Sequence, residues 1–163
     1  MILDEEVFAV IMAISIVASA VGIALVIPRN PEPFTALGLL NEEGKIGEYP
    51  KEVYVNRSFK LHVFISNHLG YTALFSVKAK LGRGEIPTNE TPLNTPVLAE
   101  KYALLCHQCN TTIPFELRLS EAARNETLVF ELYQYNPGRG IWEYTGRYVF
   151  LRINVTEVLP VGK

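Results

Sequence analysis

The only two cysteines in the chain stand three positions apart, in the run Cys106-His107-Gln108-Cys109. In an oxidising compartment such a pair closes a disulfide across a short loop, and on the loop-entropy model the bond contributes about 2 kcal/mol. A redox-active pair would instead open a helix within an alternating pattern of strands and helices, and no such pattern surrounds these residues. We therefore interpret Cys106 and Cys109 as a structural disulfide in a compartment outside the cytoplasm.

The same run does not predict a metal or haem site. A zinc site needs two further ligands, and the other histidines, His62 and His68, are single residues with no second cysteine pair beside them. Covalent haem attachment needs a histidine directly after the second cysteine, where this chain has Asn110. We expect no metal and no cofactor.

Sequence signatures of enzymes are also absent. The two Gly-Arg-Gly segments, 82–84 and 138–140, lack the later glycine or lysine of a phosphate-binding loop. The chain has no Gly-x-Ser-x-Gly elbow and no His-Glu-x-x-His motif, and apart from Asp4 to Glu6 and Glu42-Glu43 its acidic residues are scattered singly. We expect a protein that is not an enzyme and has no catalytic residues.

The chain contains five sequons for N-linked glycosylation, each an Asn followed by any residue but Pro and then by Ser or Thr. Chance would give about one in a chain of this composition. Four of them fall where we expect turns or loops, where a glycan would disturb no packing. The alternative explanation is that Asn and Thr are enriched in turns. The candidate glycosylated residues are Asn56, Asn89, Asn110, Asn125 and Asn154.

Residues Val7 to Ile27 form a continuous apolar run, softened only by two serines and a glycine. About 20 apolar residues in a helix match the hydrocarbon core of a bilayer, so the run predicts a transmembrane helix. A buried core helix would keep a polar face, and this run has none. A cleaved signal peptide is the other alternative, because Ala18-Ser19-Ala20 has the form of a cleavage site. The acidic residues Asp4 to Glu6 and the continuation of the run to Ile27 favour an anchor.

Two features disagree about which side of the membrane the rest of the chain occupies. Arg29 follows the helix and three acids precede it, which favours a cytoplasmic C-terminal side. Acidic residues contribute little to that rule, and the five sequons and the cysteine pair favour the outside. We expect an anchor at 1–29 with its helix at about 7–27, a spacer at 30–33 ended by prolines, and an extracytoplasmic domain at 34–163.

Small residues on the anchor helix lie four positions apart, a spacing that lets helix backbones approach each other closely. The two pairs are Ser15 with Ser19 and Ala18 with Gly22. They predict a contact with another membrane protein subunit, the alternative being a helix that faces only lipid. The expected partners are thus the lipid bilayer, other membrane or envelope subunits, and N-linked glycans.

Beyond residue 33 the periodicity changes from helical to alternating, which is typical of half-buried strands. We expect an all-β, immunoglobulin-like antiparallel β-sandwich, with turns at 41–44, 56–58 and 137–140 and a short helical turn at 119–124. Segments 59–66 and 74–81 are predicted to form a hairpin. The long segment 82–96 is the first candidate for a contact loop, the alternative being a plain glycosylated surface loop. The remaining candidate strands are 34–40, 52–55, 97–105, 113–119, 128–132, 141–144 and 149–155.

The charge of this domain limits its partners. Beyond Arg29 there are 14 acidic and 14 basic residues, since three acids and one base of the totals of 17 and 15 precede that point. No cluster of Lys or Arg could neutralise a run of phosphates, so we expect no nucleic acid partner. Aromatic residues gather late in the chain and predict either a contact surface or cross-strand packing: Tyr133, Tyr135, Trp142, Tyr144 and Tyr148.

Several short motifs resemble the archaeal domain of unknown function 1616 family. They are the turn Asn41-Glu42-Glu43-Gly44, the Tyr49-Pro50 step before Val53-Tyr54-Val55-Asn56, and the strand end Ile65-Ser66-Asn67-His68. The later run from Thr112 through Leu132 is also similar to the family. The resemblance implies an extracytoplasmic sandwich near an archaeal membrane and supplies no catalytic residues. Many members have several membrane segments before this domain, whereas this chain has one.

Two functions follow as expectations. The first is a structural or accessory subunit, in which the outer sandwich caps or braces a membrane or cell-envelope assembly. The second is a pilin-like or motility-associated envelope protein that joins an apolar helix to a sandwich. Such proteins carry a basic segment and a processing site before the helix, where this chain has Asp4, Glu5 and Glu6.

Overall fold

The computed structural model describes residues 4–27 and 32–157. The chain forms two compact units, Met1–Glu32 and Pro33–Lys163. Most of the predicted spacer, including Arg29 and the prolines expected to end the helix, lies outside the described residues, as do residues 158–163.

The first unit holds a single helix, α1 (Glu5–Val26). Two glutamates occupy its first turn, where the positive end of the helix dipole favours acidic side chains. Apolar residues lie on every side of it. Among the described residues this is the one helix whose length and composition are sufficient to cross a membrane.

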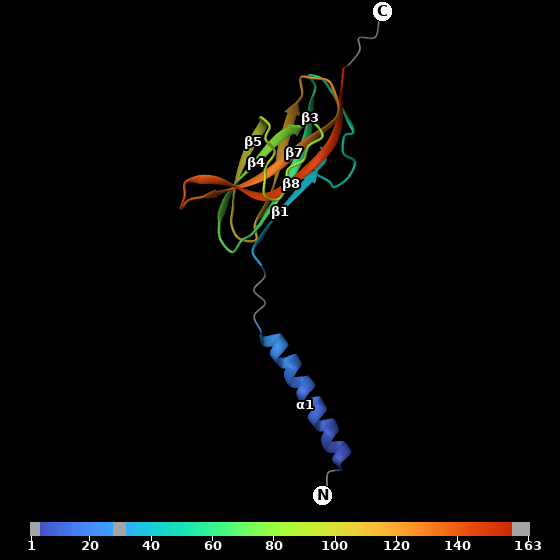
Figure 1. The fold of residues 1–163 in the computed structure, drawn as a ribbon, viewed down its shortest axis with the longest axis vertical. Coiled ribbons are helices and arrows are strands. Elements are labelled where there is room, and N and C mark those ends of the chain that lie inside the picture. Colours follow the sequence, from blue (N-terminus) through green and yellow to red (C-terminus); the bar gives the residue numbers. More distant parts are fainter. Residues whose placement is uncertain (1–3, 28–31, 158–163) are drawn as a thin grey trace, which may run out of the picture. The chain divides into compact units, whose positions relative to one another are not determined.

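The second unit is a β-sandwich of eight strands (Figure 1). Most of the strands alternate apolar and polar residues over at least part of their length, so that one side of each can be buried. The strands are β1 (Phe34–Leu40), β2 (Glu52–Tyr54), β3 (Ser58–His68), β4 (Ala73–Gly82), β5 (Val97–Leu105), β6 (Asn110–Arg118), β7 (Ala123–Asn136) and β8 (Ile141–Thr156).

The strands form one sheet of three, in the order β1-β3-β6, and one of five, in the order β2-β8-β7-β4-β5. The predicted fold class, an immunoglobulin-like β-sandwich preceded by one apolar helix, is confirmed. One detail differs from the prediction, because β2 pairs with β8 in the parallel direction while the other pairs are antiparallel.

The core lies between the facing surfaces of the two sheets. Fully buried side chains from both sheets meet there, among them Phe115 of β6 and Phe130 of β7, whose ring centroids are 5.2 Å apart. Leu61 and Ile65 of β3 are also fully buried. These residues are the apolar members of the alternating pattern, so the pattern predicted the core correctly.

The predicted hairpin between 59–66 and 74–81 is wrong. Strand β3 pairs with β1 and β6, whereas β4 pairs with β5 and β7 in the other sheet. Segment 69–72 therefore crosses between the sheets instead of joining neighbouring strands. The helical turn expected at 119–124 is also absent, since that segment bends directly into β7. The two predicted strands at 141–144 and 149–155 are both parts of β8.

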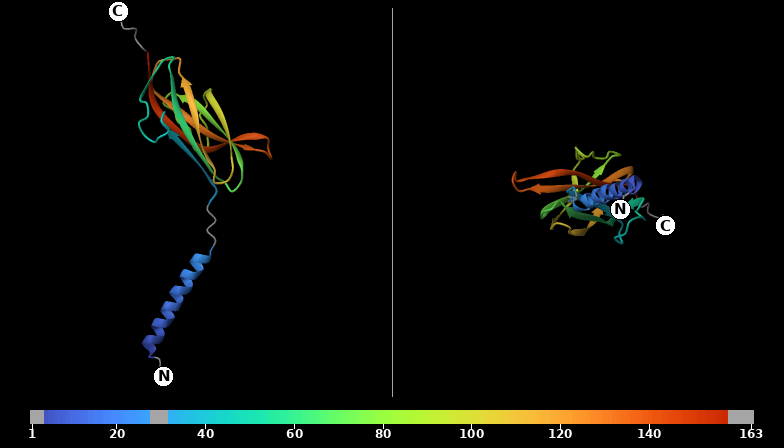
Figure 2. Two further views of the ribbon diagram at one scale, coloured as in Figure 1. Left: turned by 180° about the vertical axis from the view of Figure 1, so that it is seen from behind. Right: turned by 90° about the horizontal axis from the view of Figure 1, so that it is seen from below.

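The end of the β7–β8 hairpin projects beyond the rest of the sandwich in both side views (Figures 1 and 2). The register of the pair shifts between Leu132 and Tyr133, and Gly146 on β8 has a positive φ of 73°. This irregularity increases the local twist of the two strands, which directs the hairpin away from the sheet.

Candidate functional site

The end of the sandwich at which β1 begins is organised around Asn67, a fully buried residue at the end of β3. Its amide nitrogen donates to the carbonyls of Leu105 and Tyr71, both at 2.8 Å, and its side-chain oxygen accepts from the Leu69 amide at 3.0 Å. Leu105 belongs to β5 of the five-stranded sheet, and Tyr71 lies just before β4 of the same sheet. The Asn67 side chain therefore connects the two sheets. The sequence indicated only a turn here.

The cysteine loop packs against the same asparagine. Cys106 and Cys109 lie within disulfide distance, with Cα atoms 5.2 Å apart and their sulfur atoms bonded. The Asn67 amide donates to the Cys109 carbonyl at 2.9 Å, and the Gln108 amide donates to the Asn67 carbonyl at 2.7 Å. The loop thus links β5 of one sheet to β6 of the other, which is a structural role.

One histidine of this loop, His107, lies against His68 at the end of β3. His68 stacks on Phe34 at 4.5 Å between ring centroids, and His107 meets His68 edge to face at 6.5 Å. Nδ1 of His107 accepts a hydrogen bond from the Gly70 amide at 3.1 Å. His62, the third histidine, pairs through Nδ1 with the Asn41 carbonyl elsewhere. Within residues 4–27 and 32–157 no group of three His, Cys, Asp or Glu could hold a metal.

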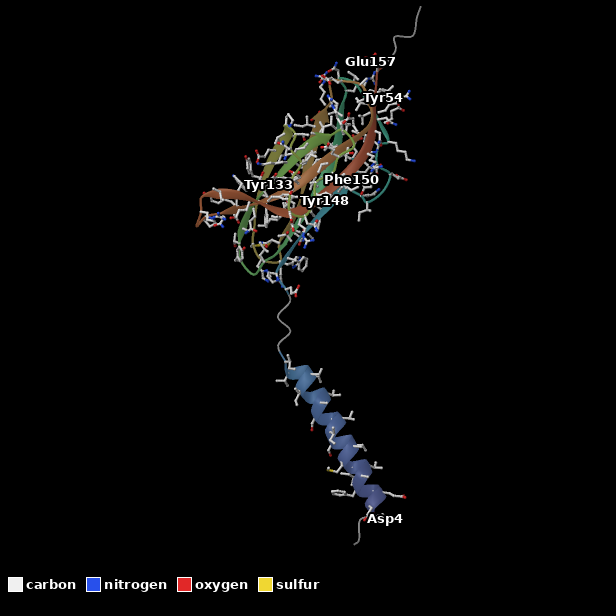
Figure 3. All side chains as sticks on the ribbon, viewed as in Figure 1. Asp4, Tyr54, Tyr133, Tyr148, Phe150 and Glu157 are labelled. Atoms are coloured by element: carbon white, nitrogen blue, oxygen red, sulfur yellow. A yellow bond between two sulfur atoms is a disulfide. The ribbon has the colours of Figure 1, made fainter. Side chains whose placement is uncertain are left out.

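The structure places all five sequon asparagines at exposed positions. Asn56, Asn125 and Asn154 lie at the end of the sandwich opposite the start of β1, where Tyr54 and Glu157 are labelled (Figure 3). Asn110 begins β6 at the other end, beside the cysteine loop. Asn89 lies in the long segment between β4 and β5.

The hydroxyl residues of the sequons fall into two groups. Ser58, Thr91 and Thr112 are exposed. Thr127 of the Asn125 sequon is fully buried, and its hydroxyl oxygen has no hydrogen-bond partner. Thr156 of the Asn154 sequon donates to the Glu52 carboxylate at 2.6 Å. A transferase that must reach both the asparagine and the hydroxyl therefore finds three complete sequons on the folded domain, at Asn56, Asn89 and Asn110.

The long segment 82–96, predicted as a contact loop, packs on the outer face of the five-stranded sheet, the face turned away from β1, β3 and β6. Its Leu93 amide donates to Glu131 Oε1 at 2.5 Å, and its Leu93 carbonyl accepts from Lys80 Nζ at 2.7 Å. Lys80 and Glu131 are themselves an ion pair, with Nζ and Oε2 2.9 Å apart. Leu93 itself is buried, so the segment is fixed near its C-terminal end.

A second attachment holds the other part of this segment against β8. The Tyr144 hydroxyl donates to the Thr88 carbonyl at 2.9 Å. Gly146 lies so close to the Asn89 carbonyl that a Cβ atom at 146 would overlap it. The segment 82–96 is thus part of the packed structure, and its backbone hydrogen bonds explain why polar strand residues lie beneath it.

Burial beneath this segment also affects two tyrosines. Desolvation, and then the hydrogen bond to the Glu131 carboxylate at 2.8 Å, raise the pKa of Tyr133 well above its usual range. Desolvation, followed by the negative charge of Glu131, raises the pKa of Tyr144 to about 12. The buried cluster consists of Lys80, Glu131 and Tyr133, whose charged and hydroxyl groups are paired with one another.

The outer face is uncovered near β5, where we define an aromatic patch of Tyr102, Tyr135 and Trp142. The Trp142 ring lies 5.3 Å from Tyr135 across the β7–β8 hairpin and 5.5 Å from Tyr102 of β5. Tyr133 and Tyr144 pair across the same strands at 5.4 Å, and Tyr148 and Phe150 lie further along β8 (Figure 3). The late aromatic residues thus do pack across strands, and part of the group stays exposed.

The small residues of α1, Ser15, Ser19, Ala18 and Gly22, are exposed on the helix, and their contact with another subunit stays a prediction. The Ser15 hydroxyl donates to the Ile11 carbonyl at 2.8 Å, and the Ser19 hydroxyl donates to the Ser15 carbonyl at 2.7 Å. Both serine hydroxyls are therefore hydrogen-bonded within the helix. Ala18 and Gly22 line a shallow hollow on this surface.

No protein-family model and no curated protein matches this chain. Among solved structures it is similar to the CARDB domain of the PF1109 protein from Pyrococcus furiosus, crystallised with di-metal ions: 10% identity over 77% of this chain and 90% of that one, TM-score 0.48. A solution structure of the same domain is 10% identical to this chain, and the match covers 76% of this chain and 95% of that one with a TM-score of 0.49. A β-glucosidase from Listeria innocua has 13% identity and a TM-score of 0.48, and the match spans 78% of this chain but only 17% of the glucosidase.

Proposed function

We propose that this chain is a single-pass membrane protein whose β-sandwich lies outside the cytoplasm and serves as a non-enzymatic structural or accessory subunit of a membrane or cell-envelope assembly. The observation that carries the proposal is the exposure of three complete sequons and a bonded cysteine loop on a domain that follows an apolar helix.

The anchor is supported by α1, which is apolar on every side and long enough to span the hydrocarbon core. The outward orientation is supported by the chemistry of the domain. N-linked glycans and stable disulfides both form outside the reducing cytoplasm, and their candidate residues are accessible or already joined. The proposed glycosylation residues are Asn56, Asn89 and Asn110.

The non-enzymatic role is supported by where the ionisable groups lie. Glu131, Lys80 and Tyr133 form the main buried cluster of the described residues, and the cluster is sealed beneath segment 82–96. A general acid or base needs access to a substrate, so this arrangement stabilises the fold. The aromatic patch, with Tyr102 exposed and Tyr135 and Trp142 half-buried, is suited to contact with another molecule, because tyrosine and tryptophan combine a large apolar surface with a polar group.

We also propose that the domain is similar to the archaeal domain of unknown function 1616 family. The residues of the resemblance have defined structural roles here. Asn41 and Gly44 form the first turn, the Tyr49 hydroxyl donates to the Leu39 carbonyl, and Asn67 joins the two sheets. These roles concern the fold, so the function of the whole protein rests on the anchor and the surface.

The proposal is tested by purifying the full chain from its native membrane in mild detergent, with mass spectrometry of the proteins that co-purify in fixed ratio. We expect at least one other membrane or envelope protein. A chain recovered alone would contradict the subunit role, and a filament made of this chain would support the pilin-like alternative.

A further inference from the structure

The described sheets have four edge strands, and three of them carry features that oppose pairing with another strand. Strand β2 has only three residues. Strand β6 has Pro114 at its centre, and proline cannot donate to a ladder. On β1 the Leu39 carbonyl already accepts from the Tyr49 hydroxyl. The free side of β8 beyond β2 carries two arginines, Arg147 and Arg152, and charge protects an edge.

The fourth edge, β5, is nine residues long, contains no proline and pairs with β4 on one side only. Its outward side chains are largely apolar and exposed: Leu104 is 69% exposed, Tyr102 58% and Leu98 42%. None of the five sequons falls within β4 or β5. The pairing with β4 is irregular only near Leu98, where the register shifts between Ala79 and Lys80, and the remainder of β5 is a long, largely apolar edge that can act as a template for another strand.

The two charged residues of β5 contact groups of their own chain, which leaves the edge open to pairing. Glu100 accepts from the Ser76 hydroxyl at 2.5 Å, and its carboxylate lies 3.7 Å from the Lys78 ammonium. The Lys101 ammonium lies 5.8 Å from the centre of the Phe115 ring in the other sheet. Neither charge therefore has to be removed for a second strand to approach.

The sequence of β5 indicates what that second strand is. Residues 98 to 104 read Leu-Ala-Glu-Lys-Tyr-Ala-Leu, which is nearly the same in both directions around Lys101. When two identical strands pair antiparallel about a twofold axis at Lys101, each Leu98 faces Leu104 of the other copy and each Ala99 faces Ala103. Each Glu100 then faces Tyr102, a carboxylate opposite a hydroxyl that can donate to it.

We propose that two copies of this chain pair through β5, antiparallel and with the twofold axis at Lys101, so that their five-stranded sheets form one continuous sheet. The palindrome favours a second copy over an unrelated strand, because a twofold interface requires a surface that complements itself. The two Lys101 residues face each other, and their attraction to Phe115 directs both ammonium groups toward their own sandwiches. The partner is therefore a second copy, a conclusion that does not depend on the orientation proposed above.

Cross-linking of the full chain in detergent tests the register. Two differently tagged variants, Leu98→Cys and Leu104→Cys, are mixed and oxidised; the native cysteines are bonded to each other and do not interfere. In the proposed register the Cα atom of residue 98 in one copy lies about 5 Å from that of residue 104 in the other copy. The two residues 98 are separated by six positions along the strands, which is about 20 Å. We expect disulfides between L98C and L104C and none between two L98C chains. No cross-link, or L98C joined to L98C, would overturn the proposal.

A second measurement tests the strength of the pairing by light scattering or sedimentation over a range of concentrations. We expect the wild-type chain to dimerise, and Leu104→Lys to weaken the dimer at least tenfold because it places a charge opposite Leu98. Ile46→Lys is the matched control, since Ile46 is an exposed residue outside β5, and it should leave the dimer unchanged. A monomeric wild type, or a dimer that L104K does not affect, would contradict pairing through β5.

Discussion

Lys80 of β4 and Glu131 of β7 form an ion pair on the outer side of the sheet, and segment 82–96 covers both side chains. Glu131 is fully buried, and it accepts from the Leu93 amide, the Tyr133 hydroxyl and Lys80. A buried carboxylate with all its partners present tolerates burial, whereas one that loses its cation does not. This cluster therefore sets the stability of the outer layer.

Replacing Lys80 by Met should lower the free energy of unfolding by about 3–5 kcal/mol, because it leaves the Glu131 charge buried without its cation. The Leu93 carbonyl also loses its donor. Denaturation of the full chain by guanidinium chloride, followed by the fluorescence of Trp142, measures the loss.

Two variants make this result specific. The double variant K80M/E131L should recover most of the stability, because it removes both charges together. Lys45→Met disrupts an exposed ion pair with Glu43 and should change the free energy by less than about 0.5 kcal/mol. If K80M and K45M lowered the free energy of unfolding equally, the buried ion pair would contribute no more to stability than an exposed one.

Gly146→Ala should release segment 82–96 from β8. The substitution combines a positive φ with an overlap between the new Cβ and the Asn89 carbonyl. Gly44 has a similar φ of 77°, and a Cβ added there would meet nothing within 4 Å. Gly44→Ala therefore measures only the cost of placing alanine at a positive φ, about 1–2 kcal/mol of folding stability. We expect G146A to be the less stable of the two, and trypsin to cleave it faster after Arg83. If G44A and G146A behaved alike, the contact with Asn89 would be unimportant.

Stability should fall as the pH rises from 10 to 12. An unfolded tyrosine loses its proton near pH 10, whereas Tyr144 in the folded state keeps its proton until about pH 12. The unfolded chain thus binds fewer protons in this window, and the free energy of unfolding decreases with pH. Tyr144→Phe removes this contribution, so its stability should depend less steeply on pH. Parallel curves for the two proteins would rule out a raised pKa at Tyr144.

Glycan occupancy should differ among the five sequons if sugar is added to the folded domain. We expect glycopeptide mass spectrometry to find sugar at Asn56, Asn89 and Asn110 and little at Asn125 and Asn154. Thr127 is buried and Thr156 is bonded to Glu52, so neither hydroxyl is free for a transferase. Thr112→Ala serves as the control, since it should abolish sugar at Asn110 alone. Similar occupancy at all five would show that transfer does not act on this folded structure.

The sequence predicted the elements well and their pairing poorly. Alternating apolar residues identified β3 and β4 because burial on one side requires that pattern, but the pattern contains no information about which strands become neighbours. The segment between them had the composition of a hairpin turn. The chain instead crosses to the other sheet there, where the Asn67 side chain donates to the carbonyl of Leu105, a residue 38 positions away.

The outer face could not be predicted for a similar reason. Lys80 and Glu131 occupy polar positions of alternating strands, which normally face water. They are buried here because a segment distant in the sequence folds over them. The cysteine pair and the sequons were recognisable because their chemistry depends on short local spacing, whereas the exposure of each sequon hydroxyl depends on the tertiary structure.

The orientation of the domain is the central claim, and labelling of intact cells tests it most directly. Lys45, Lys51 and Lys60 are exposed on the sandwich, and a charged amine reagent that does not cross membranes can reach them only from outside. We predict that mass spectrometry finds these lysines labelled as fully in intact cells as after lysis. Labelling that appears only after lysis would place the sandwich in the cytoplasm and contradict the account.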